Sequence, residues 1–368
     1  MSSPRTYIFA GGGTGGHLFP GIAVARELLR REPAARLLFV GSDKDLEQSI
    51  LAYNHLEHRA LPVESLGTLK RRPFYFVTRN WQAWNAARRL IRDERPAAVI
   101  GLGGYASAPV VWAANRAGVP VVLLEQNVIP GRTTRWLARS AAVVCVSFPE
   151  ASGRLPHGTR IEVTGNPVRR EIADLHANRT ALTDGQQREL LVLGGSQGAD
   201  ALNEAVTTAA QLLRDELSAW RIVHQTGPRQ VGTIRAAYER LSLVATVEPF
   251  FEEMAERYRA ASLVVSRAGA TTLAELTCSG LPMVLLPYPH AADDHQRANA
   301  KSLHDRGAAI VVEHRPAAAE TATQLATQLR SLLVDSSQRE AMGTAARSAA
   351  CPEAAAAVAD CIQSVVTS

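Results

Sequence analysis

Several features are missing or scarce in this 368-residue sequence, and each absence excludes a class of protein. No uninterrupted run of about 18 apolar residues occurs, so no membrane-spanning helix is expected. The first residues, MSSPRTYIFAGGG, contain neither an apolar signal segment nor a small-residue cleavage site. The four cysteines, Cys145, Cys278, Cys351 and Cys361, form no CxxC pair and no metal-ligand spacing with histidine. We therefore expect a protein of the reducing cytosol with buried thiols and no structural zinc.

The length and the apolar content indicate two domains. A chain of 368 residues exceeds the size at which a single hydrophobic core stops growing, and a hydrophobic content of 46% can fill two cores. The formal net charge of +5 is small. The positions of the basic residues therefore say more about partners than the total charge does.

The stretch 263–275, LVVSRAGATTLAE, has the pattern of a strand, a tight turn and a helix. A helix that begins at the carboxyl end of a strand attracts anions, and Thr271 and Thr272 add hydroxyl donors there. A pyrophosphate is a suitable ligand. Glu275 follows within the first turns, where its carboxylate can accept hydrogen bonds from ribose hydroxyls. An equally weighted alternative is that Glu275 only complements the helix dipole.

The N-terminal segment repeats this theme with strand 6–10, the glycine loop GGGTGGH, a helix, and strand 36–41. Gly11, Gly13 and Gly16 satisfy the GxGxxG pattern of dinucleotide-binding loops, which makes a nicotinamide-dependent oxidoreductase one hypothesis. The second strand ends without the acidic residue that holds an adenosine ribose, although Asp43 follows closely. The loop also contains His17, which a dinucleotide-binding loop does not need.

A second glycine loop, at Gly103 and Gly104, follows the strand AAVIGLG, and Glu125, Gln126 and Asn127 follow the strand VPVVLLE. Because such loops gather at the carboxyl edge of a parallel sheet, we expect both glycine loops to face one crevice. The alternative is that these glycines only make tight turns. Polar residues after two such loops favour a pocket.

A second cycle of strands, glycine turns and helices begins at ELLVLGGSQGADALNEAV. The predicted fold is α/β, with two doubly wound, Rossmann-like domains that face a cleft. We expect an N-terminal domain over residues 1–165 and a C-terminal domain over residues 166–345. The alanine-rich end, residues 346–368, is helical by composition and can pack back on the first domain.

Seven motifs, in this order and over nearly the whole chain, resemble one known family: GGGTGGHLFP, GLGGYASAP, LEQN, TGNPVR, LGGSQGA, HQTG and SRAGATTLAE. The chain resembles the MurG family of peptidoglycan N-acetylglucosaminyltransferases, in glycosyltransferase family 28. The resemblance implies the GT-B fold and transfer of N-acetylglucosamine from UDP-N-acetylglucosamine to lipid I, the undecaprenyl-diphosphate-linked N-acetylmuramyl-pentapeptide, giving lipid II. It implies that the N-terminal domain faces the acceptor and the membrane and that the C-terminal domain binds the UDP-sugar. It also implies roles in cell wall biogenesis, cell shape and cell division, at the cytoplasmic face of the cell membrane.

The resemblance also assigns residues. Glu275 matches the position that binds the ribose. Phe251 matches the position whose backbone binds the uracil, although this position commonly has an aliphatic residue. The residues that match contacts to the donor's phosphates and sugar are Ser196, Ala270, Thr271, Thr272, Arg169, Asn127 and Gln296. His295 is the alternative to Gln296. Thr14, Gly15 and Gly16 match residues on the opposite side of the cleft. The acceptor diphosphate falls to Gly13, Gly103, Gly104 and Tyr105.

The implied chemistry is inversion at the anomeric carbon by the acceptor's 4-hydroxyl. Helix N-termini with Arg169 can stabilise the UDP leaving group without a metal, so we expect neither a metal nor another cofactor. His17 is the first candidate for the base because histidine titrates near neutral pH. A role of His17 in diphosphate binding is equally weighted, and Glu125 is the alternative base. The rival hypotheses are the oxidoreductase and a non-catalytic nucleotide-sugar binder.

The segment 65–92 contains seven Lys or Arg residues and no Asp or Glu. Its basic and aromatic residues include Lys70, Arg71, Arg72, Phe74, Phe76 and Trp81. Such a segment can dock reversibly on an anionic membrane surface. The alternative is an ordinary helix whose buried face contains Trp81, Trp84 and Ile91. No nucleic-acid-binding motif accompanies the basic residues, so a nucleic-acid partner is not expected.

Overall fold

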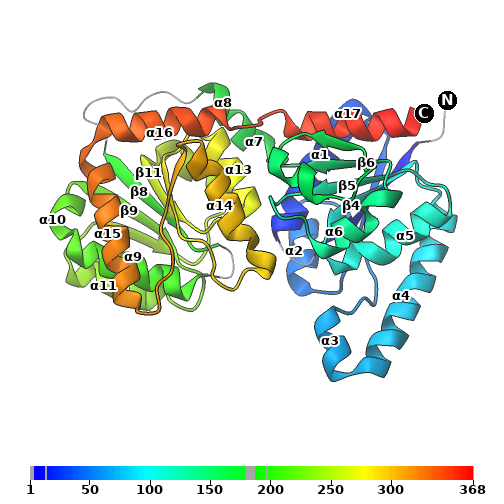
Figure 1. Cartoon of the computed structure of the whole chain (residues 1–368), viewed down its shortest axis with the longest axis horizontal. Coiled ribbons are helices and arrows are strands. Elements are labelled where there is room, and N and C mark those ends of the chain that lie inside the picture. The colour runs from blue at the N-terminus through cyan, green and yellow to red at the C-terminus, as the bar shows by residue number, and fades with distance from the viewer. Residues whose placement is uncertain (1–3, 13–14, 179–186, 196–197, 368) are drawn as a thin grey trace. The chain divides into compact units, whose positions relative to one another are not determined.

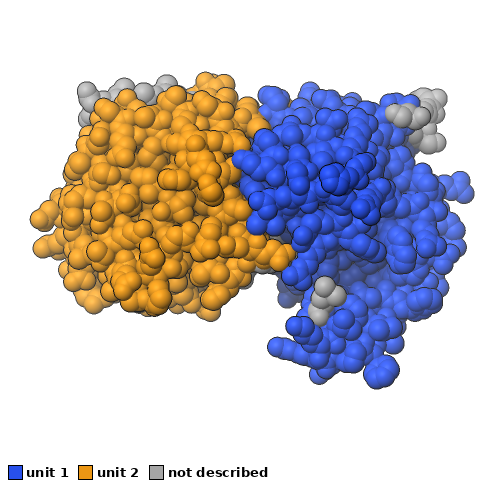
Figure 2. Space-filling model, in the orientation of Figure 1, with its two compact units in different colours: residues 1–169, 353–368 blue, residues 170–352 orange. Residues whose placement is uncertain are grey.

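The computed structural model describes residues 4–12, 15–178, 187–195 and 198–367. The chain forms two compact units (Figure 2). Unit 1 consists of residues 1–169 and 353–368, and unit 2 consists of residues 170–352. The chain therefore leaves unit 1 after Arg169 and returns to it at Glu353, whereas the sequence placed these boundaries at residues 165 and 346.

A seven-stranded parallel sheet forms the centre of unit 1, in the order β3-β2-β1-β4-β5-β6-β7. Its strands are β1 (Thr6–Gly11), β2 (Arg36–Gly41), β3 (Glu57–Ala60), β4 (Ala98–Gly103), β5 (Val121–Glu125), β6 (Val143–Val146) and β7 (Ile161–Val163). Its helices are α1 (Gly15–Arg31), α2 (Asp45–Tyr53), α3 (Leu66–Arg71), α4 (Pro73–Glu94), α5 (Ala108–Arg116), α6 (Arg132–Leu137) and α17 (Ala354–Thr367).

Both faces of this sheet are covered, as a parallel sheet requires. Alternate strand residues such as Ile8 pack with α4 and α5 in one core, whereas Tyr7 and Phe9 pack with α1, α2 and α17 in the other. Helix α17 lies beside α1, and Arg31 forms an ion pair of 2.5 Å with Asp360 (Figure 1). The C-terminal helix thus completes the core of unit 1.

Unit 2 is built on a six-stranded parallel sheet in the order β10-β9-β8-β11-β12-β13. The strands are β8 (Arg188–Leu193), β9 (Trp220–Gln225), β10 (Ala245–Glu248), β11 (Leu263–Ser266), β12 (Met283–Leu285) and β13 (Ala309–Val311). The helices are α7 (Arg170–Ala173), α8 (Leu175–Asn178), α9 (Asp200–Leu212), α10 (Arg214–Leu217), α11 (Val231–Arg240), α12 (Met254–Ala260), α13 (Ala270–Cys278), α14 (His295–Asp305), α15 (Ala318–Val334) and α16 (Ser336–Ser348). Helices α13 and α14 lie across the sheet from α9 and α15 (Figure 1).

The two parallel sheets with helices on both faces confirm the predicted α/β architecture. Two edge strands were not indicated by the sequence. The residues of β3, EHRA, are mostly exposed and carry no apolar alternation, and β13 has three residues. The expectation of buried thiols was wrong for two cysteines, because Cys351 is exposed and Cys361 is partly exposed on the returning C-terminal segment.

A buried polar network joins β9 to α9 and α11 in unit 2. The Tyr238 hydroxyl lies 2.9 Å from His224 Nδ1, and His224 Nε2 lies 3.1 Å from Asn203 Oδ1. Asn203 Nδ2 donates to the carbonyl oxygen of Thr226 at 3.0 Å. Burial lowers the pKa of His224 to about 3 and raises the pKa of Tyr238. His224 is therefore held as a neutral imidazole.

This network predicts a pH-dependent contribution to the stability of unit 2. The unfolded chain binds a proton at His224 below its ordinary pKa of about 6.5, whereas the folded chain does so only near pH 3. The contribution is present above pH 6.5 and is lost as the pH falls toward 3. Between pH 7 and 5, wild type should lose about 2 kcal/mol more unfolding free energy than His224→Gln in urea titrations. Equal losses of unfolding free energy in wild type and His224→Gln would contradict the prediction. The control is His157→Gln, at an exposed histidine, which should lose as much unfolding free energy as wild type.

Candidate functional site

Three motif loops lie at one edge of the unit 1 sheet. Strand β4 pairs in parallel with both β1 and β5, and Gly11 is in register with Gly103. The loops that follow these strands carry GGGTGGH, the second glycine pair, and the residues Glu125 to Asn127. Parallel pairing therefore brings these motifs to the same end of the sheet, as the sequence predicted.

His17 lies in the first turn of α1 and makes a specific contact across this edge. Its Nδ1 is 3.1 Å from Oε1 of Gln126, and Nε2 of Gln126 donates to the carbonyl oxygen of Leu102 at 3.1 Å. Gly103 has a φ of 97°, and a Cβ atom there would lie 3.1 Å from His17 Nδ1. Glycine at this position thus lets the imidazole pack against the strand end.

Glu125, the alternative base, is buried and holds a turn. Its Oε1 accepts the backbone N–H of Asn127 at 3.0 Å, and its Oε2 accepts the backbone N–H of Gly131 at 2.9 Å. The side chain of Asn127 also donates to Oε1, at 3.5 Å. The carboxylate therefore shapes the chain between β5 and α6, a role that the sequence did not indicate.

A second buried carboxylate, that of Glu47 on α2, supports the first glycine loop. Its Oε2 accepts the hydroxyl of Ser42 at 2.8 Å and the backbone N–H of Ser42 at 3.3 Å. A Cβ atom at Gly12 would lie 2.5 Å from its Oε1, so the loop needs glycine where it leaves β1. Asp43, the acidic residue nearest to the position that a dinucleotide site requires, is exposed.

The other predicted residues of unit 1 lie around these loops. Gly15 and Gly16 begin α1, and Tyr105 begins the short turn after Gly104. Asn127 is partly exposed beside Glu125. The guanidinium of Arg169 lies 5.7 Å from the ring centre of Phe19, so this side chain packs against α1. Gly13, Thr14 and Ser196 fall outside the described residues.

In unit 2, α13 begins at Ala270 directly after the glycine turn, as the pattern predicted. Its N-cap residue, Gly269, has no side chain that could cap the helix, and Thr271 and Thr272 are partly exposed in the first turn. Glu275 is buried, and the Tyr258 hydroxyl donates to its Oε2 at 2.8 Å. Tyr258 comes from α12, and no motif in the sequence connected it with Glu275.

Two side chains tie together the loops after β11, β12 and β13. Gln296 Oε1 accepts the backbone N–H of Tyr288 at 2.9 Å and that of Ala268 at 3.3 Å. Arg267 donates to the carbonyl oxygen of Leu286 at 2.9 Å and contacts His314. Burial lowers the pKa of Arg267 to about 10, which leaves it cationic at neutral pH. The sequence had not singled out Arg267.

Two further candidates are Phe251, in the segment after β10, and His295, in the segment after β12. Phe251 is buried, and the guanidinium of Arg257 lies 4.9 Å from its ring centre. His295 begins α14 and is partly exposed. The side chain of Phe251 is thus part of the packing, and only its backbone is a candidate for ligand contact.

The basic aromatic segment forms α3 and α4, which project beyond the sheet of unit 1 (Figure 1). Lys70, Arg71 and Arg72 are exposed, as are Phe74 at 88% and Trp81 at 65%, whereas Phe76 is half-buried. The alternative of a buried face is wrong for Trp81, although Ile91 is buried. The ring of Trp84 lies 4.3 Å from Trp112, and Trp112 lies 6.2 Å from Trp136. The exposed aromatic surface therefore continues from α4 onto α5 and α6.

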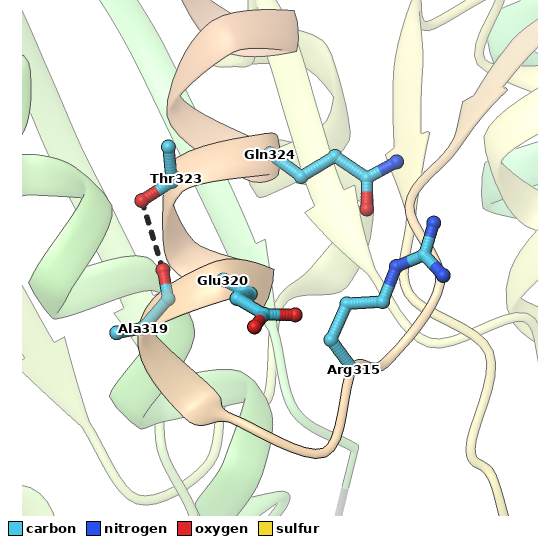
Figure 3. Close-up of a pocket in the computed structure, with 5 residues that line it drawn as sticks. All are labelled: Arg315, Ala319, Glu320, Thr323 and Gln324. Carbon is cyan, nitrogen blue, oxygen red and sulfur yellow. Dashed lines mark hydrogen bonds between the residues drawn. The ribbon is translucent and has the colours of Figure 1, made fainter.

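A shallow depression of about 460 Å³ lies elsewhere in unit 2, at the start of α15. The side chains of Arg315, Glu320 and Gln324 extend into it, and Thr323 donates to the carbonyl oxygen of Ala319 at 2.9 Å (Figure 3). It contains none of the predicted site residues. Among the described residues, no group of three or more His, Cys, Asp or Glu side chains is arranged to hold a metal. None of the described helices has the length and apolar character that crossing a membrane requires.

Comparisons with known proteins match nearly the whole chain. The glycosyltransferase family 28 N-terminal domain matches residues 7–146, and the family 28 C-terminal domain matches residues 189–362. A protein of Geobacter sulfurreducens named UDP-N-acetylglucosamine--N-acetylmuramyl-(pentapeptide) pyrophosphoryl-undecaprenol N-acetylglucosamine transferase is 40% identical over 361 residues, 96% of each chain. A relative with the same name in Syntrophus aciditrophicus is 42% identical and covers 84% of this chain and 85% of its own.

Solved structures also resemble this chain over nearly its full length. The crystal structure of Acinetobacter baumannii MurG superposes with a TM-score of 0.77 at 32% identity, covering 98% of this chain and 100% of that chain. The glycosyltransferase of kitacinnamycin, at 17% identity, has a TM-score of 0.69 over 99% of this chain and 100% of its own, a likeness of fold alone. With both domain models and full-length relatives matched, this chain belongs to glycosyltransferase family 28.

Proposed function

We propose that this protein transfers N-acetylglucosamine from UDP-N-acetylglucosamine to the 4-hydroxyl of lipid I, with inversion at the anomeric carbon. The observation that carries the proposal is the 40% identity, over 96% of both chains, to a transferase named for this reaction. Incubation with UDP-N-acetylglucosamine and a soluble lipid I analogue should release UDP only when both substrates are present. A parallel incubation with NADH tests the alternative, since oxidation of NADH without release of UDP would favour the oxidoreductase.

Most of the residues proposed to bind the donor belong to unit 2. The first turn of α13, with Thr271 and Thr272, offers N–H and hydroxyl donors to the diphosphate, and the helix dipole stabilises the charge that develops on UDP. Glu275 accepts the ribose hydroxyls. The remaining proposed donor contacts come from Gly15, Gly16, Asn127, Arg169, the backbone of Phe251, and Gln296.

Replacing Glu275 with Ala should weaken binding of UDP and UDP-N-acetylglucosamine by roughly tenfold to a hundredfold. The reason is that a hydrogen bond to a charged group contributes about 1.5–3 kcal/mol. Isothermal titration calorimetry measures the change. Glu189→Ala is the matched control, because Glu189 is also a buried carboxylate of unit 2 but lies at the amino end of β8. Unchanged affinity in Glu275→Ala, or an equal loss in Glu189→Ala, would remove the ribose assignment.

The acceptor side falls to unit 1. The glycine loops, with Gly103, Gly104 and Tyr105, offer backbone N–H groups to the acceptor's diphosphate. His17 lies beside them and is partly exposed, so it can reach the 4-hydroxyl as the general base. Glu125 is less suited to this task because both of its carboxylate oxygens already accept backbone N–H groups.

Replacing His17 with Ala should lower kcat by roughly 100-fold to 10,000-fold, the usual contribution of a general base. The KM for UDP-N-acetylglucosamine should change by less than about threefold, since His17 acts in the transition state. Steady-state kinetics with the lipid I analogue separates the two parameters. A rise in acceptor KM with kcat preserved would assign His17 to diphosphate binding instead.

The protein also needs to meet a lipid-linked acceptor, and the surface formed by α3 and α4 suits a peripheral contact with the anionic cytoplasmic face of the membrane. Phe74 and Trp81 are exposed where aromatic rings can enter the headgroup layer, and Lys70, Arg71 and Arg72 stand beside them. Each basic residue near an anionic leaflet contributes about 1 kcal/mol. Such docking is reversible.

Changing Lys70, Arg71 and Arg72 together to Glu should reduce binding to vesicles containing phosphatidylserine by at least about 100-fold, because three attractions become repulsions. Co-sedimentation with anionic and neutral vesicles measures this. The matched control changes Arg229, Arg240 and Arg259, three exposed arginines of unit 2, to Glu, with the same change in net charge. Binding that ignores lipid charge and salt, or an equal loss in the control, would exclude α3 and α4 as the docking surface.

A further inference from the structure

The side chain of Gln126 connects the proposed base to the central sheet, and its orientation is fixed by chemistry. Gln126 is 2% exposed and follows β5 directly. One end of its amide faces the carbonyl oxygen of Leu102 at 3.1 Å, and the other end faces His17 Nδ1 at 3.1 Å. A backbone carbonyl can only accept a hydrogen bond. The amide nitrogen of Gln126 must therefore face Leu102, and the amide oxygen must face His17.

This orientation also fixes the tautomer of His17. The amide oxygen of Gln126 has lone pairs and no proton, so the hydrogen bond with His17 forms only when Nδ1 carries the proton. In a neutral imidazole the other nitrogen, Nε2, then has the lone pair. Glycine at position 103 is compatible with this geometry, since a Cβ atom there would lie 3.1 Å from Nδ1.

We propose that Gln126 is a positioning residue for glycosyl transfer, which holds the proton of His17 on Nδ1 and so presents Nε2 as the proton acceptor. The inference rests on the proposed role of His17 as the base. In the reaction, Nε2 takes the proton of the acceptor's 4-hydroxyl while that oxygen bonds to the anomeric carbon. The bond between this carbon and the UDP oxygen breaks, and UDP leaves with the electron pair. The resulting imidazolium keeps its Nδ1 hydrogen bond to Gln126.

An amide is suited to this position for an electrostatic reason. In Ser-His-Asp sites a carboxylate fixes the histidine tautomer and adds a negative charge. Here the adjacent glycine loops are proposed to bind a diphosphate, and a carboxylate beside them would repel it. The amide orients the imidazole without that charge. The neighbouring carboxylate of Glu125 is occupied by backbone N–H groups.

The tautomer can be measured directly, without turnover, by two-bond ¹H–¹⁵N NMR on protein labelled at histidine. His17→Ala identifies the His17 signals among those of the ten histidines. At about pH 8, above the ordinary histidine pKa, wild-type His17 should carry its proton on Nδ1. In Gln126→Met, which keeps the length of the side chain but has no acceptor oxygen, the proton should move to Nε2 or divide between the nitrogens.

Kinetics then tests whether the tautomer matters. Gln126→Met should lower kcat by roughly tenfold to a hundredfold, the usual effect of losing a residue that orients a reacting group, with donor KM unchanged. The matched control is Gln363→Met, on α17 beside the C-terminal end of α1. Its amide also uses both ends, because it donates to Glu32 and accepts from Arg31. This control should keep the wild-type tautomer and kcat.

Three results would overturn the proposal: a wild-type His17 protonated on Nε2, a tautomer unchanged in Gln126→Met, or a moved tautomer with wild-type kcat. The wild-type spectrum decides the first point even if Gln126→Met does not fold. If His17→Ala kept its kcat, the base assignment would fail and the catalytic role of Gln126 with it. Loss of kcat in His17→Ala with wild-type kcat in Gln126→Met would instead reject Gln126 alone.

Discussion

The parallel pairing of β1, β4 and β5 is the constraint on which the geometry of the unit 1 site depends. His17 and Gln126 are 109 residues apart in the chain, and they meet because β4 lies between the strands that precede them. Parallel strands end at a common edge, so the loop after each strand opens on the same side. The apolar cores on both faces of the sheet fix this register, since a shift by one residue would move Ile8 and Tyr7 into the opposite cores, which are packed around other side chains.

Three buried carboxylates, one on α2, one at the end of β5 and one on α13, each hold a hydrogen-bond donor of the protein. Glu47 accepts from Ser42 below the first glycine loop, Glu125 accepts two backbone N–H groups, and Glu275 accepts the Tyr258 hydroxyl. A buried charge without such partners would cost several kcal/mol. The acids that a sequence reader associates with proton transfer thus serve, in unit 1, to shape the loops. This assignment leaves the imidazole as the titratable group best placed for the reaction.

The sequence predicted the strands and loops because hydrophobic periodicity and glycine turns are local signals. It missed β3 and β13, because an edge strand that packs little apolar surface carries little of that periodicity. It also missed what Gln126 and Tyr258 contact, since those contacts join segments that no local pattern connects. The segment 65–92 was compatible with either a buried or an exposed aromatic face. Tertiary packing decided between them, residue by residue, with Trp81 exposed and Ile91 buried.

The distribution of these features within unit 1 has a consequence for a lipid-linked substrate. The glycine loops, His17 and the helices α3 and α4 all belong to one compact unit with a shared sheet. If that unit holds the membrane through α4 and the acceptor through its loops, the distance from bilayer to reacting hydroxyl is set by rigid secondary structure. Unit 2 then contributes most of the proposed contacts to the nucleotide sugar, a ligand that needs no membrane surface. Weak, reversible contacts by the basic and aromatic side chains of α3 and α4 are then sufficient, because the unit that docks is also the unit that binds the acceptor.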